Sequence, residues 1–289
     1  MKIETPEGFS LFGEPLYNPV SYPDPEHKQL VKFNKAFAEW EKDPDDREKI
    51  LWLGRQHAYV GRYRAAIHIF TEGLKLFPDD PEFLRHRAHR FLSLRMFEYS
   101  IADSERAADI MLKKPDFMEP SGLAGAEETI EYTFYTNVYY HLGLAYMMKG
   151  DPINASKAFH DLLAIAVNDD HVIMSVYWNY IILKRLGFEE EVKEVLSHVK
   201  PDMNCPVSGG YYECMKMYKG EIEPEDIISG KGDEDQLSLV TSGFGVANEY
   251  RFRGEYDNYV GLLEKVLETN AWSGFGYLSA EVDMKRIKS

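Results

Sequence analysis

The sequence has little cysteine: Cys205 and Cys214 are the only two among 289 residues. Their spacing matches no metal-binding pattern, and no second pair is present to complete a zinc site. The chain also lacks an apolar stretch of about 18 residues, and its first residues do not combine a basic start with an apolar run. We therefore expect no transmembrane helix, no signal peptide and a cytoplasmic location.

Positive charge is also scarce, since 33 Lys and Arg stand against 48 Asp and Glu, for a formal net charge of −15. Phosphate affinity needs clustered Lys and Arg, so we expect no binding to nucleic acid or to an anionic membrane. An acidic balance by itself indicates mainly solubility. The sequence has no Walker loop, dinucleotide fingerprint or nucleophile elbow either, and it predicts no cofactor and no catalytic residue.

The sequence contains pairs of helical patterns separated by a residue that marks a turn, and this turn mark recurs at a nearly constant interval. The successive gaps are 34, 55, 37, 33 and 34 residues, and the marks are Gly61, Arg95 in place of glycine, Gly150, Gly187, Gly220 and Gly254. A period of about 34 residues is typical of two-helix repeats. The long gap is one period plus an insertion of 21 residues, at 115–135. Connections in helical arrays are normally much shorter.

The first and third repeats also share residue types at equivalent positions. The first helix of each carries a Leu-Gly pair, Leu53–Gly54 and Leu142–Gly143, and the second helix carries Ala and then Phe four residues later. Small residues let two helices approach closely, and large residues fill the space between them. We expect both glycines at close helix–helix contacts, and no β-sheet within residues 47–200.

In these residues the chain resembles the tetratricopeptide repeat (TPR) family, and as a whole it resembles microbial proteins that contain this repeat. The resemblance is specific for residues 47–114 and 136–170, fair for 173–200, and weak for 206–229 and 240–271, which lack the Leu-Gly pair. It implies an all-α fold, a right-handed TPR-like α-solenoid of about 12–14 helices. It also implies a scaffold for protein–protein interaction and peptide binding.

Three parts are predicted along the chain. Residues 1–46 form an extended N-terminal segment and a capping helix, because prolines at the start restrict φ and remove backbone donors. Residues 47–200 hold the clear repeats, with the insertion at 115–135. Residues 201–289 hold degenerate TPR-like repeats and a C-terminal capping helix.

The resemblance also implies a groove, because the first helix of each repeat lines the concave face of a TPR superhelix. Transferring those positions predicts ten ligand-binding residues: Arg55, Tyr59, Arg85, His86, His89, Asn137, Tyr140, His141, Tyr177 and Trp178. The weaker sixth repeat adds Phe244, Asn248 and Arg251. A guanidinium matches two carboxylate oxygens. We therefore predict a monomer or homodimer that binds a peptide, a protein partner or a small acidic ligand.

Other readings of the same residues stay open. The arginines and histidines could form a solvated face or pair with acidic residues of neighbouring helices. An enzyme or a metal-binding protein could combine the groove histidines with Glu127, Glu128 or Glu131.

A further alternative is that the chain fills its own groove with the insertion. The insertion carries apolar residues, among them Phe117, Met118 and Leu123, whose exposure to solvent would be costly. Its carboxylates could pair with the groove arginines. We therefore predict that residues 115–135 lie over the groove beside the second and third repeats.

Overall fold

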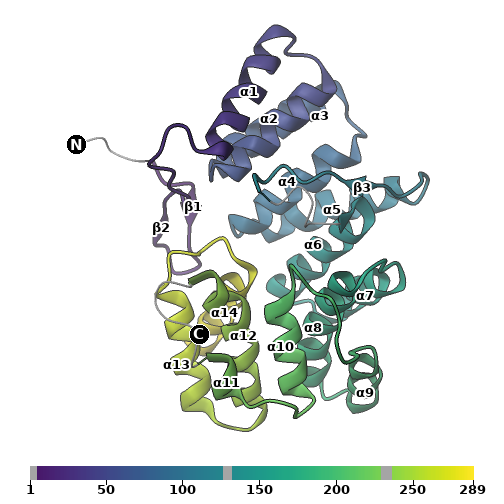
Figure 1. Ribbon diagram of the computed structural model, residues 1–289, viewed down its shortest axis with the longest axis vertical. Helices are drawn as coiled ribbons and strands as arrows, with labels where there is room; N and C mark the ends of the chain where they lie inside the picture. Colours follow the sequence, from purple (N-terminus) through teal and green to yellow (C-terminus); the bar gives the residue numbers. More distant parts are fainter. Residues whose placement is uncertain (1–4, 126–131, 229–235) are drawn as a thin grey trace. The chain divides into compact units, whose positions relative to one another are not determined.

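The computed structural model describes residues 5–125, 132–228 and 236–289, and nearly all regular secondary structure within them is helical (Figure 1). The contacts divide the chain into two compact units, residues 1–145 and 146–289, which we call the N-terminal unit and the C-terminal unit. The three parts predicted above describe repeat character rather than contacts, and they stay a prediction.

The N-terminal unit begins with a small hairpin, in which strands β1 (Gly8–Phe9) and β2 (Pro15–Leu16) pair antiparallel. Five helices follow: α1 (Lys28–Lys42), α2 (Arg47–Tyr59), α3 (Tyr63–Leu76), α4 (Pro81–Ser93) and α5 (Phe97–Met111). The insertion carries two further strands, β3 (Met118–Glu119) and β4 (Tyr132–Thr133). It leads into α6 (Phe134–Lys149), whose last turn belongs to the C-terminal unit.

The C-terminal unit continues with helices only, as far as the structure describes it. They are α7 (Pro152–Ala164), α8 (Asp169–Leu186), α9 (Glu189–Ser197), α10 (Gly209–Tyr218), α11 (Pro224–Ile228), α12 (Gln236–Phe252), α13 (Tyr256–Leu267) and α14 (Phe275–Ile287). Together with the first six, these make fourteen helices in the described residues, and the predicted all-α repeat fold is confirmed.

The two short ladders correct two expectations. The N-terminal segment is not simply extended but turns back on itself, because Ser10 Oγ accepts hydrogen bonds from the backbone N–H groups of Phe12 and Glu14. Gly13 closes this turn with a φ of 86°. Within residues 47–200, where the sequence predicts no sheet, β3 pairs antiparallel with β4. That ladder is two residues long and lies inside the insertion, so the helical periodicity of the repeats carries no sign of it.

All six predicted turn marks adopt the left-handed backbone conformation. Their φ angles lie between 64° and 96°, at Gly61, Arg95, Gly150, Gly187, Gly220 and Gly254. Glycine adopts this conformation without steric cost, whereas Arg95 places a Cβ atom there. Each mark separates two helices, so α2 to α13 form six helix pairs, with α1 before them and α14 after them. The pairs include α10–α11 and α12–α13, where the TPR resemblance of the sequence is weak.

The Leu-Gly pair of the first repeat marks a close contact between α2 and α3. A Cβ atom built on Gly54 would lie 2.3 Å from the Phe70 ring, so only glycine fits there. Phe70 belongs to a cluster of buried residues from α2, α3 and α4. The contact expected at Gly54 is therefore present.

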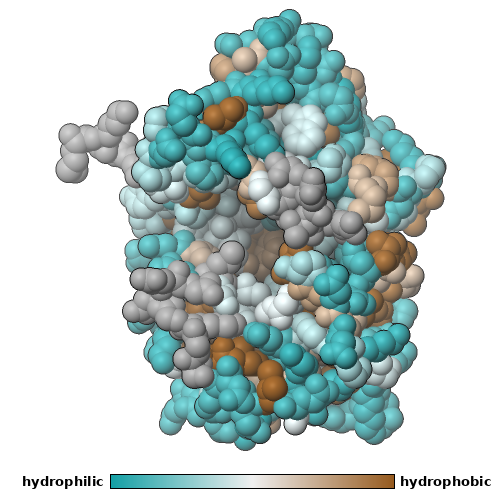
Figure 2. Space-filling model, viewed as in Figure 1, coloured by the Kyte–Doolittle hydropathy of each residue, from teal (hydrophilic) through white to brown (hydrophobic). Residues whose placement is uncertain are grey.

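Hydrophobic side chains lie mainly inside the molecule. The face in Figure 2 is largely hydrophilic, with scattered hydrophobic patches. None of the described helices is both long enough and apolar enough to cross a membrane.

Candidate ligand-binding site

The insertion lies against the helices that carry the predicted groove residues of the N-terminal unit. Arg55 of α2 donates a hydrogen bond to the carbonyl of Pro120. The backbone N–H of Gly122 donates to the Tyr59 hydroxyl at 3.3 Å, and that of Ala124 donates to Gln29 Oε1 of α1 at 2.9 Å. These contacts agree with the inward path predicted for the insertion, but the burial expected for its apolar residues is wrong, because Phe117, Met118 and Leu123 are exposed.

At the centre of this contact lies the carboxylate of Glu119, whose side chain is only 2% exposed. Oε2 lies 3.3 Å from Arg85 Nε and accepts a hydrogen bond of 2.9 Å from Asn137 Nδ2. Oε1 lies 3.1 Å from His86 Nε2 and 3.8 Å from Arg55 Nη2. The four partners come from α2, α4 and α6, the first helices of three successive repeats. We call these five residues the Glu119 cluster.

The Glu119 cluster holds one carboxylate between two guanidinium groups. Burial alone would raise the pKa of Glu119, but Arg85, His86 and Arg55 together hold it well below its usual range. Burial and the charge of Arg85 lower the pKa of His86 to about 3. His86 is therefore neutral at pH 7. Arg85 Nη1 lies 2.8 Å from His86 Nδ1, which must accept, so the imidazole proton is on Nε2, 3.1 Å from Glu119 Oε1.

Four of the other predicted residues surround the cluster in the N-terminal unit. The rings of His89 and His141 lie 4.0 Å apart, and Tyr140 packs edge-on against His141. Burial lowers the pKa of both histidines well below the usual value. His141 Nδ1 lies 2.6 Å from the carbonyl of Asn137, so this nitrogen carries the proton. Tyr59, the fourth, contacts the insertion as described.

The two predicted residues of the C-terminal unit lie elsewhere. Tyr177 and Trp178 are fully buried in α8, where their rings pack on Tyr211 of α10. Trp178 also packs on Phe244 of α12. The sequence predicts these rings on a groove surface because an aromatic side chain on a helix needs a cover. The cover is the chain itself.

The carboxylate that meets the groove arginines is not one of those predicted. Glu127, Glu128 and Glu131 lie outside the described residues, whereas sequence reasoning missed Glu119. A signal was available, because the Pro120 that follows restricts Glu119 to extended backbone. Among the described residues, no group of three or more His, Cys, Asp or Glu side chains has an arrangement that could hold a metal ion.

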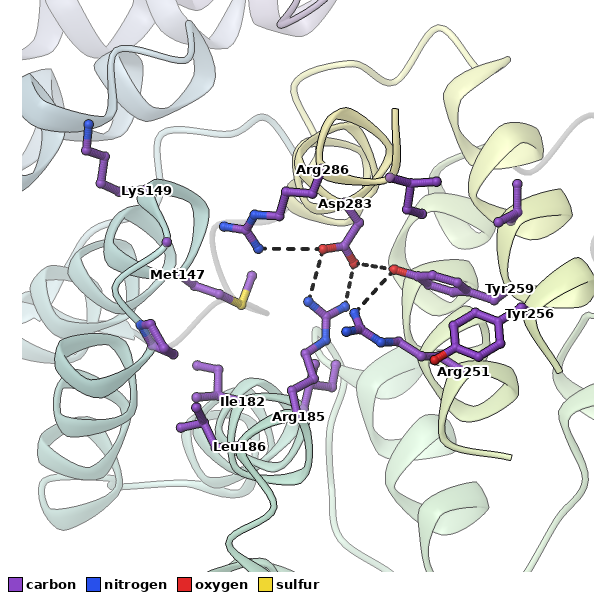
Figure 3. A pocket seen from close by; sticks show the side chains of 15 residues that line it. Met147, Lys149, Ile182, Arg185, Leu186, Arg251, Tyr256, Tyr259, Asp283 and Arg286 are labelled. Atoms are coloured by element: carbon purple, nitrogen blue, oxygen red, sulfur yellow. Dashed lines mark hydrogen bonds and ion pairs between the residues drawn. The ribbon is translucent and has the colours of Figure 1, made fainter. Parts of the chain in front are cut away.

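The C-terminal unit contains an open pocket of about 750 Å³ (Figure 3), which we call the basic pocket. It lies at the ends of α6, α8 and α12 and beside α13 and α14. Four cationic side chains line it, together with one carboxylate, Asp283: Lys149, Arg185, Arg251 and Arg286. Sequence reasoning found Arg251 among these residues and missed the others.

A network around Asp283 organises the polar side of the pocket. Arg185 of α8 binds both carboxylate oxygens, and its Nε also donates to Asn248 Oδ1 of α12 at 2.9 Å. The Tyr259 hydroxyl donates to Asp283 at 2.9 Å, and Arg286 lies 3.8 Å from the same carboxylate. Figure 3 shows that these side chains converge from α8, α13 and α14.

Burial has different effects on the charges of this network. Burial and the nearby Asp283 raise the pKa of Tyr259 to about 12, so this phenol stays neutral and donates. Burial would lower the pKa of Arg185, but Asp283 raises it, so the guanidinium stays charged. Arg185 and Asp283 thus neutralise each other. The positive charge of the pocket comes from Lys149, Arg251 and Arg286.

No protein-family model matches the sequence, and no curated protein is significantly similar to it. Among solved structures, the chain is similar to YrrB, a TPR protein with an unusual peptide-binding site, at 12% identity and a TM-score of 0.45. That alignment covers 88% of this chain and 97% of YrrB.

A chain of the APC/C hetero-tetramer Cut9–Hcn1 is similar at 14% identity and a TM-score of 0.48, over 83% of this chain and 36% of that one. The TPR domain of P58(IPK) is similar at 15% identity and a TM-score of 0.27, over 91% and 87%. These likenesses concern the fold. They carry nothing about what this chain binds.

Proposed function

We propose that this chain is a binding scaffold of TPR-like repeats, and that it takes an acidic ligand in the basic pocket of the C-terminal unit. The observation that supports this most directly is the charge of the lining: four cations against one carboxylate, in a chain of net charge −15. Such a local excess of positive charge attracts an anion that the acidic remainder of the surface would repel.

The predicted groove arginines are less suited to an external ligand. The side chains of Arg55 and Arg85 are 3% and 9% exposed, and Glu119 already lies between them. An outside carboxylate could reach them only if residues 118–124 left α2 and α4. The ligand-binding role of the ten predicted groove residues therefore stays a prediction, and for the eight in the N-terminal unit it requires that displacement.

Within the basic pocket, the arginines have different tasks. Arg185 directs its donors to Asp283 and Asn248, so it holds α8, α12 and α14 together rather than facing a ligand. The side chain of Arg286 is 50% exposed, and Arg251 makes a long contact of 3.5 Å with the Tyr259 hydroxyl and lies over the Tyr259 ring. These two guanidinium groups are the ones that an anion can recruit.

Titration calorimetry with a hexaglutamate peptide at low ionic strength tests the proposal. The double variant Arg251→Ala/Arg286→Ala should bind at least about tenfold more weakly than the natural chain, because each charge-assisted hydrogen bond contributes roughly 1.5–3 kcal/mol. The matched control is Arg253→Ala/Lys288→Ala, which removes the same charge from residues outside the pocket lining. Equal loss in both variants would reject the pocket as the site, and no binding by the natural chain would exclude an acidic peptide as its ligand.

The sequence predicts three kinds of acidic ligand, namely a peptide, a protein partner and a small molecule. The chemistry of the rest of the pocket distinguishes between them. The cytoplasmic location and the monomeric or homodimeric state stay predictions.

A further inference from the structure

The walls of the basic pocket differ sharply in chemistry. Three arginine side chains gather around Asp283 and Tyr259, and Lys149 lies apart from them in Figure 3, whereas six aliphatic or thioether side chains line much of the remainder: Met147, Ile181, Ile182, Leu186, Val260 and Ile287. Figure 3 shows Met147, Ile182 and Leu186 together on one side of the Asp283 network. A ligand that fills the pocket must therefore be polar at one end and apolar along the rest.

The apolar wall argues against a peptide as the occupant. Every residue of a bound peptide brings a backbone N–H and C=O that need partners when they leave water. Apart from Lys149 and Tyr256, the polar side chains of the lining lie close to Asp283, and the six apolar residues offer no side-chain donor or acceptor. A hydrocarbon body has no such groups and loses nothing by facing this wall.

The size of the pocket also fits a small molecule. Its volume of about 750 Å³ falls within the range of roughly 300–1,000 Å³ that is usual for small-molecule sites. Helix ends wall it on several sides, from α6, α8 and α12. In the N-terminal unit, the insertion already covers the helix faces along which an extended peptide would lie.

We propose, on the basis of the function proposed above, that the basic pocket binds a small amphipathic anion. A single carboxylate or phosphate head group lies at Arg251 and Arg286, and its hydrocarbon body lies against Met147, Leu186 and Ile287. Asp283 does not repel the head group strongly, because Arg185 neutralises it and Tyr259 donates to it.

The experiment measures binding of hexanoate, octanoate and decanoate to the full chain by titration calorimetry. Because burying one methylene contributes about 0.8 kcal/mol, each added methylene should tighten binding about fourfold. Octyl phosphate serves as the phosphate arm, and whichever of the two heads binds more tightly identifies the head-group class. Octylammonium and octanol, which have the same body without an anion, should bind at least about tenfold more weakly than octanoate.

Two variants separate the head group from the body. Arg251→Ala/Arg286→Ala should abolish the preference for octanoate over octanol, whereas Arg253→Ala/Lys288→Ala should keep it. Ile287→Asn, at a position 48% exposed, should weaken decanoate binding more than hexanoate binding. Circular dichroism of each variant shows whether the helices are intact. Because Ile287 is half exposed, Ile287→Asn should leave the C-terminal unit folded, so it can still test the apolar wall if another variant unfolds.

The outcomes distinguish this inference from the function on which it rests. If hexaglutamate binds and alkyl carboxylates show no dependence on chain length, the amphipathic ligand is wrong and the scaffold for acidic groups stands. If alkyl anions bind with the expected dependence and hexaglutamate does not, the inference holds and a peptide ligand is excluded. Binding of octylammonium as tight as that of octanoate would overturn the anion site altogether.

Discussion

Replacing Glu119 with glutamine keeps the size of the side chain but leaves two guanidinium groups buried without a carboxylate. The side chains of Arg55 and Arg85 are 3% and 9% exposed, so water cannot take the place of the missing charge. Removing one partner of a buried ion pair costs roughly 3–5 kcal/mol. The total stability of a domain is about 5–15 kcal/mol, so the loss should be a large share of it.

The amide should be less harmful than a truncation. His86 Nε2 faces Oε1 and Asn137 Nδ2 donates to Oε2, so the single carbonyl of a glutamine can accept from only one of them, whereas Glu119→Ala leaves both without an acceptor. We expect Glu119→Ala at the upper end of the range. Urea denaturation followed by circular dichroism measures both free energies of unfolding.

Hydrogen exchange, a second measurement, identifies where in the structure the loss of stability arises. The backbone N–H of Gly122 donates to Tyr59 and that of Ala124 to Gln29, so their hydrogen exchange should become faster when the insertion loosens. The control is Asp79→Asn, which removes a carboxylate that is 81% exposed and paired with Arg106 at the surface. It should change stability by no more than about 0.5 kcal/mol.

Unfolding of Glu119→Gln at the same urea concentration as the natural chain would show that the two buried guanidinium groups do not need this carboxylate. A double-mutant cycle adds a stricter condition. Arg85→Met in the Glu119→Gln background removes one of the two uncompensated charges, so it should restore part of the lost stability. Strictly additive losses would show that the pair is not coupled.

Three other predictions concern packing, backbone and protonation. Gly54→Leu should cost about 1–3 kcal/mol or more, since even a Cβ atom lies 2.3 Å from Phe70, and an unchanged Tm would contradict this contact. Arg95→Gly should be more stable than Arg95→Ala by roughly 1–2 kcal/mol, because a φ of 64° is unfavourable for any residue with a Cβ atom; equal Tm values would exclude this strain. His86 and His141 are buried with lowered pKa, to about 3 for His86, so below about pH 6.5 the unfolded chain takes up protons that the folded chain does not. The contribution of His86 is fully present above that pH, so the free energy of unfolding should fall by about 2 kcal/mol between pH 7 and pH 5 from His86 alone, and His141 should add to the fall. A urea series over pH with no slope there would show that these histidines are already charged in the folded state.

The backbone plan could be predicted from sequence because each turn leaves a local mark. A left-handed residue between two helices selects glycine, and its recurrence near 34 residues locates every helix pair. The marks also locate α10–α13, where the residues of the repeat core have diverged. Arg95 was found by spacing alone, since the residue type gave no hint of its φ of 64°.

The candidate sites could be predicted only in part, because their partners come from segments without a repeat. The sequence placed Arg55, Arg85, His86 and Asn137 on one surface and assigned them a carboxylate. It could not show that the carboxylate is Glu119, which reaches them through an irregular loop. The basic pocket is even harder to predict from the sequence, because Arg185 and Asp283 are 98 residues apart and α14 follows no repeat register.

Glu119 has a further consequence for how the N-terminal unit unfolds. A plain repeat array behaves as a chain of nearest neighbours, so end repeats can fray while the others stay folded. Here a single side chain contacts α2, α4 and α6 at once, and therefore links the first repeat to the third. Opening any of the three exposes the same buried charges, so partial unfolding gains little. Cooperativity thus extends over three repeats, which cannot be exchanged one at a time as they can in an array of independent modules.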